Sequence, residues 1–114
     1  MIGATLAAAA FSLSLASPAR AATPNFDCAS TSVSAYCYAY VDGNAAGVAG
    51  LSKSGNHWNV LDRPLNGYSL KVRVYADNGN VVDYTQQGYS IYYGISHIYV
   101  WVVGYGLSPS VNVA

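Results

Sequence analysis

Apolar and polar residues alternate over short stretches from residue 22 onward, and turn-forming residues separate these stretches. A period of two places successive side chains on opposite faces of an extended strand. Tyr, Val and Ile dominate the stretches, so the pattern predicts strands rather than helices. The expected strands are Val33–Val41, Ala45–Ser52, His57–Leu61, Tyr68–Ala76, Asn80–Gln86, Tyr89–Tyr93 and Ile95–Val103. One more short edge strand is expected in the tail, Gly106–Ala114.

Short strands at this spacing are typical of a small antiparallel β-sandwich, immunoglobulin-like or a partly open barrel, with about six to seven strands. The segment before them, residues 1–21, has an Ala-rich apolar middle and ends in Ala19-Arg20-Ala21, a small-x-small cleavage pattern. No Lys or Arg precedes its apolar stretch. We expect residues 1–21 to be a signal peptide and residues 22–114 to form a single all-β domain, secreted to the extracellular space.

The hairpin around Asp77-Asn78-Gly79 is detailed enough to predict a register. A three-residue loop, with its glycine in the left-handed region, pairs Val74 with Val82 on the apolar face and sets Arg73 opposite Asp83 on the polar face. A two-residue turn would instead pair Val74 with Asp83 and point a carboxylate into the core. The three-residue loop is therefore the predicted one, and the Arg73–Asp83 pair fixes the register rather than performing catalysis.

The two cysteines, Cys28 and Cys37, predict one structural disulfide. A tight turn near Ser32-Val33 would make them direct cross-strand neighbours within disulfide reach. A redox site would need a closer pair of the Cys-x-x-Cys type.

Tyrosine is unusually frequent, with eleven in the chain. The small and aliphatic residues of the first and last predicted strands suit the core, so the aromatic residues alternate to the outside. The outward rows are Tyr36, Tyr38 and Tyr40 on the first strand, and His97, Tyr99 and Trp101 on the last. If these two strands are neighbours, the rows form one continuous aromatic surface. Two alternatives stay open: Trp101 in the core, and tyrosines that form a plain strand surface.

Charge and motifs narrow the function classes. The charged residues after residue 21 are Asp27, Asp42, Asp62, Asp77 and Asp83, with Lys53, Arg63, Lys71 and Arg73. No basic stripe is present to bind nucleic acid or a membrane surface. No nucleophile elbow is present, and a triad built on His57 and Asp62 has no supporting spacing. His57 and His97 are too few for a zinc site by themselves. We expect no enzyme activity, no cofactor and no metal.

Three functions fit what remains. The favoured one is a binding module whose Tyr and Trp residues contact polysaccharide or cell envelope, because flat aromatic faces stack on sugar rings. The second is an inhibitor of a secreted amylase or protease, acting through exposed loops around Trp58 or Arg63. The third is a self-associating surface protein, because the run Ile98–Val103 is uncharged and strongly β-prone.

Overall fold

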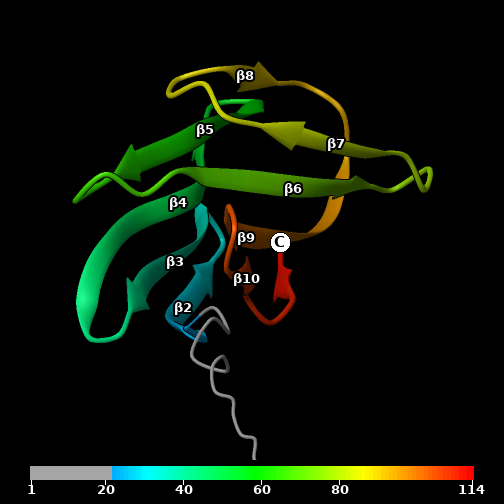
Figure 1. Ribbon diagram of the computed structural model, residues 1–114. Coiled ribbons are helices and arrows are strands. Elements are labelled where there is room, and N and C mark those ends of the chain that lie inside the picture. The colour runs from blue at the N-terminus through cyan, green and yellow to red at the C-terminus, as the bar shows by residue number, and fades with distance from the viewer. Residues whose placement is uncertain (1–21) are drawn as a thin grey trace, which may run out of the picture.

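The computed structural model describes residues 22–114, which form two stacked antiparallel sheets with no helix among them (Figure 1). The first sheet consists of β2 (Pro24–Thr31), β3 (Ser34–Val41), β4 (Asn44–Ser54), β5 (His57–Pro64) and β8 (Ser90–Ile91). The second consists of β6 (Leu70–Ala76), β7 (Val81–Tyr84), β9 (Ile95–Val102), β10 (Gly106–Leu107) and β11 (Val111–Asn112). The predicted small β-sandwich is confirmed. The expected signal peptide lies outside the described residues.

The order of strands decides which surfaces can combine. In the first sheet the chain runs through consecutive hairpins in the order β2-β3-β4-β5, and β8 pairs with the far edge of β5. In the second sheet β9 lies between β6 on one side and β10 and β11 on the other. The strands β3 and β9 therefore belong to different sheets, and they meet only across the core. Over residues 22–114, the structure contains no helix of the length and apolarity that a membrane span requires.

The core consists of the inward rows of the two sheets. The aliphatic row of β9, Ile98, Val100 and Val102, is fully buried, as its alternation predicts. The inward residues of β3 are small and face this row from the other sheet. They include Ala35 and Cys37, which are also fully buried. Burial of these apolar rows is the main stabilising contribution, because the described residues have few charges to pair.

The predicted disulfide is confirmed, and it joins β2 to β3. Cys28 lies directly opposite Cys37, with their Cα atoms 4.0 Å apart. β2 was not among the strands expected from alternation, although the predicted cross-strand disulfide implied an extended segment at Cys28. Most of its outward positions are polar, and its inward ones, such as Phe26, are only half-buried at the edge of the sheet. The disulfide therefore anchors an edge strand that contributes little to the core by itself.

The β6–β7 hairpin has the predicted register and extends to one side of the sandwich (Figure 1). Val74 pairs with Val82 and Arg73 with Asp83 around a three-residue loop that ends at Gly79, whose φ is +92°. The Arg73 guanidinium donates two hydrogen bonds to the Asp83 carboxylate, at 2.8 and 3.1 Å. These bonds lower the pKa of Asp83 and raise the pKa of Arg73.

Candidate functional site

A groove runs along the outer face of the first sheet, over β3, β4 and β5. Two rows of paired residues cross these strands: Tyr36, Gly50 and Leu61 in one, and Tyr38, Val48 and Arg63 in the next. In both rows a smaller residue of β4 lies between two larger side chains. The two walls stand on strands roughly 10 Å apart, since neighbouring strands are about 4.8 Å apart. The outer surface is therefore hollowed along β4.

We name this feature the tyrosine groove. It contains two adjoining cavities of about 200 and 270 Å³ that share Tyr38, Val48 and Arg63. Its other main lining residues are Ser34, Tyr36, Tyr40, Ala45, Ser52, Leu61 and Leu65. Tyr38 is 47% exposed, and its ring meets the ring of Tyr36 edge-on, with ring centres 5.7 Å apart. Tyr38 is thus held in place by Tyr36 and open to solvent, while Tyr36 and Tyr40 are half-buried.

The backbone of β4 maintains the hollow. Gly50 has a φ of +154°, and a Cβ at this position would lie 2.7 Å from the Cβ of Tyr36. A β-bulge at Ala39 and Tyr40 then turns Ala46 into the core and leaves Ala45 opposite Tyr40. Each tyrosine of the wall therefore faces a small or medium-sized residue on β4.

Arg63 supplies the charge of the groove. Its side chain is exposed on the wall opposite the tyrosines. In the part of the chain that the structure describes, the only ion pair joins Arg73 to Asp83, so no carboxylate neutralises Arg63. Its guanidinium can donate hydrogen bonds to a ligand in the groove.

The outer face of the second sheet carries a different group of side chains, four aromatic and two cationic, which we name the aromatic plate. It consists of Lys71, Arg73 and Tyr75 on β6 with His97, Tyr99 and Trp101 on β9. Tyr75 stacks on His97 with ring centres 4.5 Å apart. The Lys71 ammonium and the Arg73 guanidinium lie 5.1 and 5.0 Å from the centre of Trp101. All six side chains are half-buried, so the plate packs largely against itself.

The first and last predicted strands, β3 and β9, are not neighbours, so the two aromatic rows do not form one continuous surface. Tyr36, Tyr38 and Tyr40 lie on the first sheet, and His97, Tyr99 and Trp101 lie on the second. Both rows point away from the shared core, so they occupy opposite faces of the sandwich. Trp101 lies on the outer face, but it is half-buried beneath neighbouring side chains. Arg63, which was expected in a separate loop, lies on β5 across the groove from the tyrosine row instead.

Trp58 does not belong to an exposed binding loop. It lies on the inward row of β5 and is only 7% exposed. The segment before it is a tight hairpin between β4 and β5, in which Ser54 pairs with His57. The expectation that Trp58 belongs to an exposed loop is wrong: its indole packs in the core beside Val60, as a strict period of two along β5 would place it.

The apolar run of the last long strand is not a free edge. β9 pairs with β6 along its whole length, and β10 and β11 cover its other side. Its backbone donors and acceptors are largely paired within the domain, so stacking through this strand would first require opening of the sheet.

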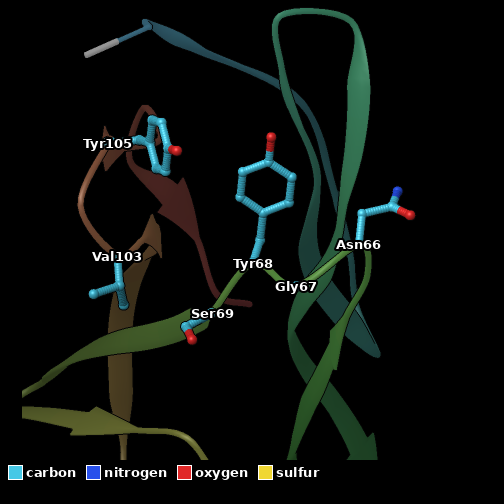
Figure 2. Close-up of a pocket in the computed structure, with 6 residues that line it drawn as sticks. All are labelled: Asn66, Gly67, Tyr68, Ser69, Val103 and Tyr105. Atoms are coloured by element: carbon cyan, nitrogen blue, oxygen red, sulfur yellow. The ribbon is translucent and has the colours of Figure 1, made fainter. Parts of the chain in front are cut away.

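A cleft at one end of the sandwich was not predicted from the sequence. Its first part is a cavity of about 400 Å³ beside Tyr68 and Tyr105, whose rings meet edge-on with centres 5.6 Å apart. Figure 2 shows the two rings rising on the same side, above Ser69 and Val103. Tyr105 lies in a loop, where a period of two assigns no face. Tyr68 was expected to begin the strand Tyr68–Ala76, but β6 begins at Leu70, so Tyr68 lies in the loop before it.

The second part of this cleft, which we name the β5–β6 notch, is a cavity of about 390 Å³. Its lining residues are Asp62, Pro64, Ser69, Leu70, Lys71, Thr85 and Val103. Burial raises the pKa of the Asp62 carboxyl to about 6. Its Oδ1 atom is buried and has no hydrogen-bond partner within residues 22–114.

The histidines are used in ring contacts. His57 stacks on Tyr92 with ring centres 4.8 Å apart, and His97 stacks on Tyr75. Within residues 22–114, no three His, Cys, Asp or Glu side chains come together in a way that could hold a metal ion.

Comparison with known proteins gave no match: no protein-family model, no curated protein and no solved structure matches this chain.

Proposed function

We propose that this protein is a secreted, non-catalytic binding module that holds a linear polysaccharide in the tyrosine groove. The observation that carries the proposal is the repeated arrangement of a tyrosine, a smaller β4 residue and a Leu or Arg across three strands. Ser34 and Tyr40 mark the two ends of the tyrosine wall, and the six residue-to-residue steps between them span roughly 20 Å. A groove of that length fits an extended chain of several sugar units.

The groove offers partners for both the apolar C–H face and the hydroxyl groups of a sugar. The exposed ring of Tyr38 and the side chain of Leu61 offer apolar surface for the C–H face of a pyranose. The unpaired Arg63 and the hydroxyls of Ser34 and Ser52 offer hydrogen bonds for its hydroxyl groups. Tyrosine also loses little side-chain entropy on binding, because it has few rotatable bonds.

An extended peptide fits this groove less well. Peptides usually bind a sheet by adding a strand at a free edge, where backbone groups are unpaired. The groove lies over β4, which is hydrogen-bonded to β3 on one side and β5 on the other. A peptide in the groove would leave its own backbone groups without regular partners, whereas sugar hydroxyls need only side chains.

Export to the extracellular space is part of the proposal. The Cys28–Cys37 disulfide is consistent with an oxidising compartment. The small number of charges and the many hydroxyl groups suit a module that binds neutral polymers rather than nucleic acid.

Affinity electrophoresis tests the proposal. The protein of residues 22–114 is run in native gels that contain soluble β-glucan, xylan, mannan or starch, and at least one polymer should retard it. Tyr38→Ala should weaken that retardation by at least about tenfold, because the ring is exposed at the centre of the wall. Tyr92→Ala is the matched control, because Tyr92 is 68% exposed but does not line the groove.

Three results would overturn the proposal. They are unretarded migration of the wild type in every gel, unchanged retardation of Tyr38→Ala, and binding of extended peptides without binding of any polysaccharide.

A further inference from the structure

The β5–β6 notch holds a polar group that the fold does not satisfy. Asp62 lies on the inward side of β5, opposite the fully buried Ala49, where the neighbouring inward residues are apolar. Its Oδ1 atom is buried without a hydrogen-bond partner in the described part of the chain. A carboxylate in such surroundings is unfavourable unless it receives a hydrogen bond, and the notch that Asp62 lines gives room for a ligand that donates one.

The walls of the notch restrict what could complete it. Lys71 lines the same cavity as Asp62, but its ammonium lies 5.1 Å from the centre of the Trp101 ring on the outer face of the second sheet. Asp62 itself disfavours a bound anion. Ser69 and Thr85 add hydroxyl-bearing residues, while Leu70 and Val103 are apolar. The walls therefore favour a ligand without negative charge that has both hydroxyl groups and an apolar face, and a neutral sugar meets all three conditions.

The neighbouring cavity extends the site. It shares Ser69 and Val103 with the notch and opens beside the edge-to-face pair of Tyr68 and Tyr105 (Figure 2). Tyr105 is 40% exposed, so part of its ring is available for stacking. Each of the two cavities falls within the roughly 300–1,000 Å³ that is usual for small-molecule sites.

We infer that the β5–β6 notch and the adjoining Tyr68–Tyr105 cavity form a second ligand site, which takes a single neutral sugar unit. A sugar hydroxyl donates a hydrogen bond to the Asp62 carboxylate, and the C–H face of the ring contacts Tyr105. This site is separate from the tyrosine groove, because the two share no lining residue. The inference does not require that the groove binds polysaccharide.

Saturation-transfer NMR with methyl glycosides of glucose, galactose, mannose and N-acetylglucosamine tests the inference. At least one glycoside should bind the wild type in the millimolar range, as expected for a small ligand with few contacts. Asp62→Asn has nearly the same shape and removes the charged acceptor, so it should weaken binding by about tenfold or more. Tyr105→Ala should weaken it by about three- to tenfold through loss of stacking.

Matched variants separate this site from the groove and from charge effects. Asp27→Asn makes the same charge change at an exposed position of β2 and should leave glycoside binding unchanged. Tyr38→Ala should leave it unchanged as well. Thermal unfolding of each variant checks that the fold is intact.

The inference is overturned if no glycoside binds the wild type, or if Asp62→Asn binds as well as the wild type while folded. It is also overturned if Tyr38→Ala abolishes glycoside binding, because the sugar would then occupy the groove. The proposed function is judged separately, by affinity electrophoresis. If Tyr38→Ala loses polysaccharide retardation and Asp62→Asn keeps it, polysaccharide binding in the tyrosine groove is supported even when the inference about the notch fails.

Discussion

Asp62 on β5 lies directly opposite Ala49 on β4, and both residues belong to rows that face the core. Ala49 is fully buried, whereas Asp62 lies where the row reaches the β5–β6 notch. Loss of hydration at this position raises the pKa of Asp62 from 3.8 to about 6. The folded protein therefore holds a carboxylate where an uncharged group would be more favourable.

Asp62→Asn is expected to stabilise the protein at neutral pH. Because the folded-state pKa of Asp62 lies above its unfolded value, the folded state binds the proton more tightly, and wild-type stability falls as the pH rises from about 4 to about 6. The variant does not titrate there, so its advantage grows over that range to about 1–2 kcal/mol, a value reduced because the carboxyl is partly solvated. Urea unfolding at about pH 4 and about pH 8 measures this difference. An equal stability gap at both pH values would contradict it.

Removal of the Cys28–Cys37 disulfide should destabilise the protein by about 2–3 kcal/mol, because the closed loop is short. The loss should be greatest at β2, which is an edge strand with few buried residues. Cys28→Ala combined with Cys37→Ala, compared with the wild type in urea unfolding, gives the value. A reducing agent should lower the stability of the wild type in urea and leave that of the double variant unchanged. If the stability of the wild type is also unchanged, the disulfide is not stabilising.

The two tryptophans should differ in accessibility and in their contribution to stability. Trp58 is 7% exposed in the core, whereas Trp101 is half-buried on the outer face of β9. Acrylamide should quench Trp101, observed in Trp58→Phe, more strongly than Trp58, observed in Trp101→Phe. Trp58→Ala should cost about 3–5 kcal/mol of stability, and Trp101→Ala clearly less. The reverse order of quenching would show that the inward and outward rows are misassigned.

Gly50→Ala should destabilise the protein by about 2–4 kcal/mol, because the new Cβ would collide with the backbone of β3 and the base of Tyr36. Gly55→Ala is the comparison. Gly55 also has a positive φ, but a Cβ there meets nothing within 4 Å, so only about 1–2 kcal/mol of backbone strain is expected. Equal costs in chemical denaturation would mean that the β3–β4 approach at Gly50 is looser than described.

The sequence predicts those parts of the fold in which local polarity distinguishes one arrangement from another. The Arg73–Asp83 register follows because the alternative turn would place a carboxylate in the core. The inward row of β9 follows because Ile98, Val100 and Val102 alternate with larger, more polar side chains. In both cases a shift by one residue would reverse every side chain, so the pattern admits one solution.

Contacts between distant segments could not be predicted in this way. The local sequence does not determine whether β9 pairs with β6 or with β3. The sequence therefore could not show that the two aromatic rows lie on different sheets. The groove also depends on β5 carrying Arg63 to the face of Tyr38, a relation across two strand pairings. The burial of Trp58 was predictable, because Val60 lies two residues further along the same row.

Chemical-shift mapping of the ¹⁵N-labelled protein with an oligosaccharide of the retarding polymer tests the groove most directly. The proposed function predicts that the amide resonances of Tyr36, Tyr38, Val48 and Arg63 shift together on titration, in a saturable way. Resonances of the aromatic plate, such as that of Tyr99, should stay unchanged. Shifts centred on β6 and β9, with none on β3, β4 and β5, would contradict the proposal and assign polysaccharide binding to the opposite face.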